Sequence, residues 1–282
     1  MEFCVGWEND PFCPDVSVLL EFLLKLFNEG MAYRTLNVVR SAVSAVAIIE
    51  GSPAGQHHLI KRFMRAAHNK RPALPRYNQT WDPDVALTYL SKLGANDQLS
   101  LLMLGKKLTF LLLLLSGQRF QIISLFDIRY MSLSSSNVCF YVTKPMKTTT
   151  PHSHVGEIVF TEFPRDRNIC VLHTLSAYLA RSEALRGPTN ELLITSTIPH
   201  RAASRDTLTR WTRDIMLGAG INVDLFRPYS VKAAGVSKAA QTLSLNNIMS
   251  SVGWKRESTF RTFYNMPVYS QGEFGAAVLV NM

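Results

Sequence analysis

The chain has 282 residues, of which 47% are hydrophobic, and this is enough apolar surface for two separately packed domains. Lys and Arg exceed Asp and Glu by 9, which favours a polyanionic partner such as a nucleic acid, although many unrelated proteins are also basic. The most hydrophobic run, residues 108–115, is too short to cross a bilayer, so no membrane role is expected.

The first quarter of the chain has the apolar spacing of helices. A helix is expected over residues 16–27, a second over 38–49 after a plausible N-cap at Thr35, and a third over 56–68. These helices predict a small helical domain over residues 1–70.

A cluster of basic residues with no acid among them lies at the end of this domain. It comprises Lys61, Arg62, Arg65, Lys70, Arg71 and Arg76. Prolines punctuate residues 71–83, which predicts a linker. The cluster is compatible with an ordinary solvated face and tether, but its single sign favours contact with DNA.

The second domain is expected over residues 84–282. Its helices are predicted over 83–93 and 99–116, and two short strands over 137–142 and 156–160 form a hairpin with a long polar tip. The remainder is again mainly helical, so the predicted fold class is mainly α with a small β-hairpin or sheet (α+β).

Several residues bear on possible chemistry. The four cysteines form no CxxC pair, no secretion signal begins the chain, and His152 and His154 stand alone at the hairpin tip, so we expect a reduced, intracellular protein without a metal or cofactor. Arg119 follows a long apolar helix, where a guanidinium is costly unless it is paired, binds an anion or caps the helix. Cations, a hydroxyl nucleophile and a proton donor suffice for metal-free cleavage of a phosphodiester.

Four segments together resemble the active-site boxes of tyrosine recombinases, with the closest likeness to those of DIRS/Ngaro-type retrotransposons. They are Ser116-Gly117-Gln118-Arg119, the run from Pro228 to Ala239, Gly253-Trp254, and Thr259-Phe260-Arg261-Thr262-Phe263-Tyr264. Further similarities at residues 33–44, 71–72, 81–82, 208–211 and 218–221 extend the resemblance over nearly the whole chain.

The resemblance implies a role for each matched residue. Arg119 would grip the scissile phosphate, and Lys147 would be the general acid, with Lys144 as its substitute and as a DNA contact. Trp254 would donate its indole N–H, although a tryptophan is more often a core aromatic. Tyr264 would be the nucleophile that forms a 3′-phosphotyrosyl intermediate and frees a 5′ hydroxyl, with Tyr269 as a weaker rival.

The chain departs from the family at Tyr229 and Lys232, where the family typically has His-x-x-Arg. A tyrosine can still donate one hydrogen bond to a phosphate oxygen. A lysine keeps the charge of arginine but loses the planar fork that holds two phosphate oxygens. If Lys232 is only a weaker substitute, Lys232→Arg should raise cleavage.

The implied protein is a site-specific recombinase or integrase of mobile-element origin, located in the nucleus. A helical core-binding (SAM-like) domain and a tyrosine-recombinase catalytic domain would clamp double-stranded DNA, as a homo-oligomer that is tetrameric on DNA, without a small-molecule substrate. The apolar segment 274–280 would pack into a neighbouring protomer or fold back on its own domain. The alternatives are a catalytically decayed DNA-binding protein and a helical interaction scaffold.

Overall fold

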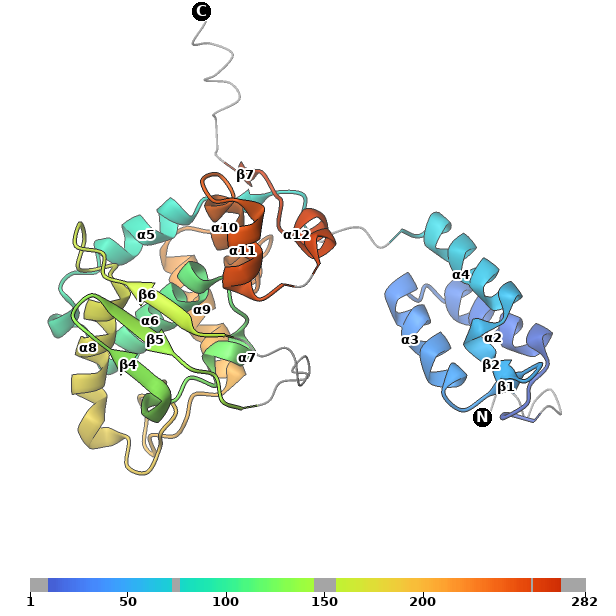
Figure 1. The fold of residues 1–282 in the computed structure, drawn as a ribbon, viewed down its shortest axis with the longest axis horizontal. Coiled ribbons are helices and arrows are strands. Elements are labelled where there is room, and N and C mark those ends of the chain that lie inside the picture. Colours follow the sequence, from blue (N-terminus) through green and yellow to red (C-terminus); the bar gives the residue numbers. More distant parts are fainter. Residues whose placement is uncertain (1–9, 73–76, 145–155, 255, 270–282) are drawn as a thin grey trace, which may run out of the picture. The chain divides into compact units, whose positions relative to one another are not determined.

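The computed structural model describes residues 10–72, 77–144, 156–254 and 256–269. The chain divides into two compact units, Met1–Arg76 and Tyr77–Met282, hereafter unit 1 and unit 2. Helices form most of both units and the sheets are small (Figure 1). This confirms the predicted fold class, mainly α with a small β component. None of the described helices is long and apolar enough to span a membrane.

Unit 1 contains three helices and one short hairpin. They are α2 (Val16–Asn28), α3 (Tyr33–Ser44), β1 (Ile48–Ile49), β2 (Ser52–Pro53), the 3-10 turn η1 (Ala54–Gln56) and α4 (His58–Lys70). Asp15 caps α2 by accepting a hydrogen bond from the Ser17 amide at 2.8 Å. Leu23, Leu36 and Ile60, one from each helix, are fully buried and form the centre of the core.

The prediction for the second helix was wrong at both ends. The helix begins at Tyr33, so Thr35 lies inside it, and Ala32 occupies the N-cap without a side-chain hydrogen bond. It ends at Ser44 because Glu50 and Gly51, with φ of 51° and 73°, form a left-handed turn that pairs β1 with β2. The apolar run that predicted helix up to residue 49 therefore ends in a strand.

Unit 2 is built around one buried helix, α6 (Leu101–Ser116). The preceding elements are β3 (Thr80–Trp81), α5 (Pro83–Ser91) and η2 (Asn96–Gln98). After α6 come α7 (Phe120–Ile123), η3 (Ile128–Tyr130), β4 (Met131–Leu133), β5 (Asn137–Phe140), β6 (Ile158–Thr161), α8 (Val171–Ser182), η4 (Glu183–Leu185), α9 (Arg205–Gly218), α10 (Ser230–Ala239), α11 (Leu245–Val252), α12 (Glu257–Phe263) and β7 (Val268–Tyr269). Helices α8, α9 and α10 all pack on α6, which explains its nearly continuous apolar sequence.

The predicted two-stranded hairpin is a three-stranded antiparallel sheet in the order β4-β5-β6. Cys139 in β5 lies opposite Ser132 in β4 and Val159 in β6. The sequence did not predict β4 because the strand is short and its Ser132 and Leu133 side chains are exposed, so it lacks the apolar alternation of a half-buried strand.

Residues 77–83 of the range expected to be a linker belong to unit 2, and two of them form a strand. Thr80 and Trp81 form β3, which pairs in parallel with β7, and Trp81 is buried. The Trp81 indole Nε1 donates a hydrogen bond to Ser230 Oγ at 2.9 Å, and Ser230 is the first residue of α10. The indole therefore fixes the start of the helix that carries Lys232.

Lys107 is a buried lysine in the middle of α6. Its side chain is fully buried and Nζ has no hydrogen-bond partner among the described residues. Burial lowers the pKa of Lys107 from 10.5 to about 8, although Asp166 opposes the shift. The folded state thus disfavours the charged form of Lys107. Between pH 8 and 10.5, Lys107 therefore binds more protons in the unfolded chain than in the folded one.

We expect Lys107→Met to raise the free energy of unfolding at pH 7, because it removes a buried ammonium without a hydrogen-bond partner at nearly constant volume. In the wild type, Lys107 makes the free energy of unfolding rise with pH between about 8 and 10.5, by at most about 1.4 kcal/mol per pH unit. In Lys107→Met, this contribution to the pH dependence should be absent. Urea unfolding at several pH values measures both effects. Lys106→Met is the matched control, because Lys106 is paired with Asp214 at 2.7 Å; equal behaviour of the two variants would contradict the interpretation.

Candidate active site

Arg119, Lys232, Trp254 and Tyr264 meet at one place in unit 2, although 145 residues of sequence separate the first from the last. Lys232 Nζ lies 4.9 Å from the centroid of the Trp254 ring and 5.4 Å from that of the Tyr264 ring. The two rings are 4.4 Å apart with an interplanar angle of 38°. The Arg119 charge acts on both Lys232 and Tyr264. The structure therefore brings together four of the six predicted catalytic residues.

The turn before Arg119 is fixed by its neighbours. Gly117 ends α6 with a φ of 60°, and a Cβ at this position would come within 3.0 Å of Val236. Gln118 is buried, and its Nε2 donates a hydrogen bond to the Ser251 carbonyl at 3.3 Å. Arg119 itself is exposed and begins α7. These contacts tie the position of Arg119 to the end of α11, where Trp254 follows.

Arg119 does not cap the helix that precedes it. The last turn of α6 is closed by the Gly117 amide, which donates to the Leu113 carbonyl at 3.2 Å. No hydrogen bond or ion pair of the Arg119 guanidinium is found among the residues that the structure describes. The helix-capping alternative for Arg119 is thus not supported, and the guanidinium is available for an anion.

Lys232 lies on α10 and is buried, with 6% of its surface exposed. Burial, and then repulsion by Arg119, lower the pKa of Lys232 from 10.5 to about 7. The two aromatic faces stabilise its charged form only in part, since cation–π contacts are weaker than an ion pair. At neutral pH, both the amine and the ammonium are populated.

Trp254 is placed by the end of α11. Gly253 has a φ of 74°, and the Trp254 amide donates to the Met249 carbonyl at 2.9 Å, as in a Schellman cap. The Trp254 ring is partly buried against Val236, Ile248 and Phe260, yet its Nε1 has no hydrogen-bond partner among the described residues. A buried indole N–H normally has a partner, so this donor is available to a ligand.

Tyr264 closes α12, and its amide donates to the Phe260 carbonyl at 2.9 Å. Ser237 of α10 donates from Oγ to the Tyr264 carbonyl at 2.6 Å, which fixes the tyrosine backbone relative to Lys232. Burial raises the pKa of the Tyr264 hydroxyl, and Arg119 opposes this shift. The phenol is therefore a poor nucleophile unless another group takes its proton.

Tyr229 lies at the edge of this site. Its side chain is 64% exposed, and its ring packs edge-on against Phe120, the residue after Arg119, at 5.1 Å. Lys147, the predicted general acid, lies outside the described residues, as do His152 and His154.

No family model and no curated protein matches the chain, but solved structures do. The XerH site-specific recombinase in a post-cleavage complex with palindromic difH substrate matches with a TM-score of 0.61 and 12% identity, over 95% of this chain and 73% of that chain. A fragment of the Tn1549 transposon integrase in complex with transposon right end DNA matches with a TM-score of 0.60 and 11% identity, over 95% of this chain and 85% of that chain. A lambda integrase dimer bound to a core site matches with a TM-score of 0.51 and 11% identity, over 86% of this chain and 77% of that chain.

The fold is that of the tyrosine recombinases.

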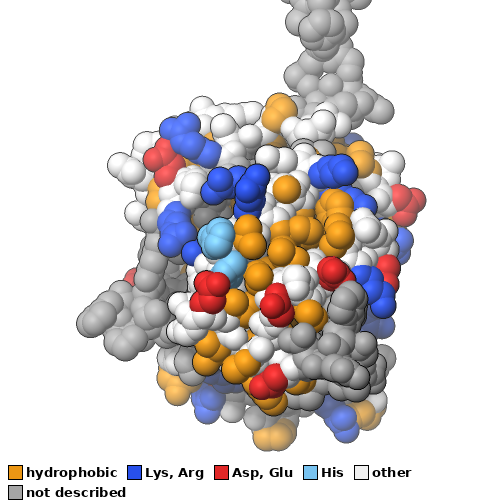
Figure 2. Space-filling view, turned by 90° about the vertical axis from the view of Figure 1, so that its right-hand side faces the viewer, with side chains coloured by type: hydrophobic (Ala, Val, Ile, Leu, Met, Phe, Trp, Pro, Cys, Tyr) orange, Lys and Arg blue, Asp and Glu red, His pale blue; other side chains and the backbone are white. Residues whose placement is uncertain are grey.

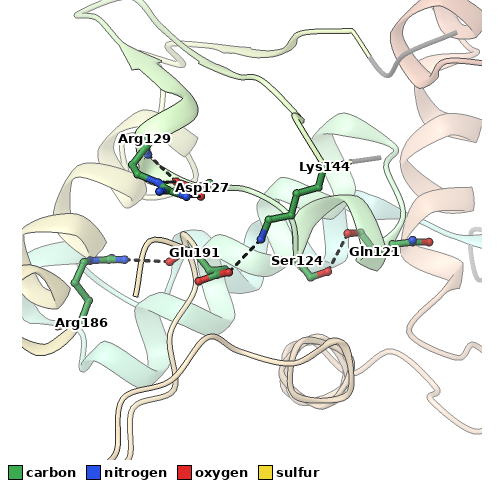
Figure 3. Close-up of polar contacts among 7 residues, drawn as sticks. All are labelled: Gln121, Ser124, Asp127, Arg129, Lys144, Arg186 and Glu191. Atoms are coloured by element: carbon green, nitrogen blue, oxygen red, sulfur yellow. Dashed lines mark hydrogen bonds and ion pairs between the residues drawn. The ribbon is translucent and has the colours of Figure 1, made fainter. Parts of the chain in front are cut away.

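Lys144 is the last described residue before the segment of this recombinase fold that carries Lys147, and it is engaged in an ion pair. Its Nζ lies 3.2 Å from Glu191 Oε1, and Figure 3 marks this ion pair with a dashed line. The Glu191 carbonyl in turn accepts a hydrogen bond from Arg186 at 3.0 Å. The pair holds Lys144 to the loop that contains Glu191, which follows α8. It also makes Lys144 less available as a substitute for the general acid.

The same region contains a second charge pair. Asp127 is 4% exposed and accepts hydrogen bonds from Arg129 Nε and Nη2 at 3.0 and 2.7 Å (Figure 3). The Arg129 guanidinium holds the pKa of Asp127 below its usual value. Both Asp127 and Glu191 therefore act as anchors on unit 2, and neither contacts the four-residue site.

The predicted DNA-binding residues differ in their availability. Lys61, Arg62, Arg65 and Lys70 are exposed on α4, while Ile60, Met64 and Ala67 are buried on its opposite face. Arg71 instead packs on the Phe27 ring at 4.0 Å and donates to the Phe27 carbonyl at 2.6 Å. Arg76 lies outside the described residues. Figure 2 shows one face of the molecule, on which both Lys or Arg and Asp or Glu side chains lie around an area of hydrophobic side chains.

Three positioning residues were not predicted: Gln118, Ser237 and Glu191. Gln118 and Ser237 lie within the segments that resemble the recombinase boxes, so the sequence indicated that they lie near the site. It did not indicate their hydrogen-bond partners. Glu191 has no recognisable motif, and its pairing with Lys144 follows only from the fold. Among the described residues, no three His, Cys, Asp or Glu side chains gather where they could hold a metal ion.

Proposed function

We propose that the chain is a DNA strand transferase that cleaves and rejoins DNA through a 3′-phosphotyrosyl intermediate at Tyr264, without a metal or cofactor. The observation that carries this proposal is the meeting of Tyr264 with Lys232, Trp254 and Arg119 in one partly buried site. The tyrosine-recombinase fold supports the same chemistry.

Each residue of the site has a defined task. The Tyr264 oxygen attacks the scissile phosphorus as its O–H proton leaves, and the bond from phosphorus to the 5′ oxygen breaks. Arg119 stabilises the charge on the non-bridging oxygens, as does Lys232 once it carries a proton, and the unpartnered Trp254 Nε1 donates a hydrogen bond to one of them. Lys147 gives its proton to the leaving 5′ oxygen. The ester conserves the bond energy, so rejoining is the reverse reaction.

The partner would be double-stranded DNA. The exposed cations of α4, together with a formal net charge of +9, suit phosphate neutralisation. The XerH, Tn1549 and lambda structures are DNA complexes, one of them a dimer. We assign unit 1 as a core-binding domain and unit 2, which includes residues 77–83 of the expected linker, as the catalytic domain, in a homo-oligomer that is tetrameric on DNA.

The proposed biological role is site-specific recombination or integration by a mobile element of the DIRS/Ngaro retrotransposon type, in the nucleus. Its support is the sequence resemblance, including the spacing of 22 residues from Lys232 to Trp254 and 10 more to Tyr264. The rival is a DNA-binding protein derived from such a recombinase, in which Tyr229 and Lys232 mark lost catalysis.

The test is covalent trapping on nicked duplexes tiled across the DNA that flanks the coding sequence of the chain, in the presence of EDTA. We expect a protein–DNA species that survives denaturing electrophoresis. Tight, salt-sensitive binding without this species on any duplex would favour the DNA-binding rival, and absence of both would favour an interaction scaffold.

The cationic face of α4 gives a separate prediction. Replacing Lys61, Arg62 and Arg65 together with alanine should weaken binding at all DNA sequences. The slope of log affinity against log salt should fall by roughly 0.9 for each phosphate that the protein no longer neutralises. Fluorescence anisotropy at a series of salt concentrations measures the slope, with wild type and Asn69→Ala, at an exposed and uncharged position of the same helix, compared in parallel. An unchanged slope in the triple variant would show that α4 does not contact the backbone.

A further inference from the structure

The buried amine of Lys232 lacks the environment of a permanent cation. No carboxylate is paired with it among the described residues, the charge that acts on it is that of Arg119, and the Trp254 and Tyr264 rings lie beside it. A buried ammonium without a counter-ion is costly. The site thus favours the neutral amine, a form that an arginine at this position could not take.

Other charged groups on the elements that pack against α10 are engaged elsewhere. On β3 and α5, Asp82 and Asp84 are both ion-paired with Lys238, six residues along α10 from Lys232. On α6, Lys106 pairs with Asp214, and Lys107 interacts with Asp166. On α12, Glu257 pairs with Arg261. Among the described residues, Arg119 and Tyr264 are therefore the titratable groups left beside Lys232.

Tyr264 needs a proton acceptor, and its surroundings offer few. The arginine guanidinium and the tryptophan indole are hydrogen-bond donors without an acceptor, so neither Arg119 nor Trp254 can take the proton. Ser237 already donates to the Tyr264 carbonyl, and Tyr229 packs at the edge against Phe120. The amine of Lys232, whose nitrogen lies 5.4 Å from the Tyr264 ring centroid, is the one basic group beside the phenol among the described residues.

We propose that Lys232 is the general base that takes the proton of the Tyr264 hydroxyl during cleavage. This inference rests on the proposed function, and it gives Lys232 a different task from that of the arginine that the family has at the matched position.

The step balances without a further reactant. The lone pair of the Lys232 nitrogen accepts the phenolic proton as the Tyr264 oxygen bonds to phosphorus and the 5′ oxygen leaves, protonated by the general acid. Lys232 becomes an ammonium at the moment when negative charge builds on the phosphoryl oxygens. In rejoining, the ammonium returns the proton to the departing Tyr264 oxygen.

The proposal predicts a pH dependence with a definite sign. The base must be neutral to act, and the pKa of Lys232 is lowered to about 7. When the protein concentration is too low to saturate the DNA, the pH dependence of the cleavage rate reports the pKa of the base in the free protein. The rate should rise about tenfold per pH unit below pH 7 and level off above it.

The experiment compares wild type with Lys232→Arg by single-turnover cleavage from pH 5.5 to 9. A general base contributes about 10²- to 10⁴-fold to the rate. We therefore expect the cleavage rate of Lys232→Arg at pH 8 to be at least about 10²-fold lower than that of wild type. Its pH–rate profile should also lack the rise that ends near pH 7. Lys238→Arg, on the same helix but paired with carboxylates, should keep both the rate and this rise. A Lys232→Arg protein as fast as wild type would overturn the proposal and make Lys232 only a phosphate clamp.

A second variant distinguishes a general base from a general acid at position 232, and it also serves as a control for misfolding. Lys232→Met is assayed on a duplex with a sulfur in place of the leaving 5′ oxygen, which departs without a proton. We expect the variant to remain slow on this substrate, because loss of a base is not rescued by a better leaving group. Restored cleavage would show that Lys232 is the acid and would overturn the proposal. Failure of wild type to cleave either substrate would instead count against the proposed function.

Discussion

Gly235→Ala is expected to destabilise unit 2 by at least about 3 kcal/mol. Gly235 lies in α10 where this helix crosses α6, and an added Cβ would overlap the Leu114 carbonyl oxygen and lie 3.2 Å from its carbon. Backbone atoms of a fully packed helix cannot move aside as a flexible side chain can. The crossing also sets the distance from Lys232 on α10 to Arg119 just beyond α6, so any surviving fold should lose cleavage.

Urea unfolding followed by circular dichroism measures this effect. Gly156→Ala is the control, because an added Cβ there meets nothing within 4 Å. A Gly235→Ala protein within about 1 kcal/mol of wild type would show that α10 and α6 do not approach as closely as the structure has them.

Arg119→Ala is expected to reduce the rate of cleavage by about 10²- to 10³-fold, with little change in stability or DNA affinity. The guanidinium is exposed and is not needed to close α6, so its removal leaves the fold intact. It also removes the positive charge that lowers the pKa of Lys232, so the limb of the pH–rate profile should move to higher pH.

Single-turnover cleavage on the trapping substrates tests this prediction. Arg119→Lys should recover part of the rate, because it restores the charge without the fork. Arg165→Ala, another exposed arginine of unit 2, should behave as wild type. An Arg119→Ala protein with full activity would remove Arg119 from the site.

Periodicity predicted the bounds of α2, α4, α5 and α6 to within two residues, and it failed where a turn decided the outcome. The apolar run up to residue 49 has helical spacing, but the left-handed turn at Glu50 and Gly51 makes it a strand. The burial of Trp81 likewise depends on Ser230, a partner 149 residues away, which no local pattern encodes.

The candidate site was predicted from the resemblance of its segments to recombinase motifs, and its electrostatics were not predicted. The sequence shows a lysine at position 232, but not that the lysine is buried beside Arg119 without a carboxylate. It shows Trp254, but not that the indole N–H is buried and unpartnered among the described residues. These properties arise from the packing of α10, α11 and α12 against the end of α6, and they carry the proposed chemistry.

The most direct test of the account is to identify the residue that carries DNA in the trapped protein, by protease digestion and mass spectrometry of the nucleotide-linked peptide. We predict that the 3′ phosphate is attached to Tyr264 and that Tyr264→Phe gives no adduct while Tyr269→Phe gives a normal yield. Attachment to Tyr269, Tyr229 or any other residue would contradict the assignment of Arg119, Lys232, Trp254 and Tyr264 as one active site.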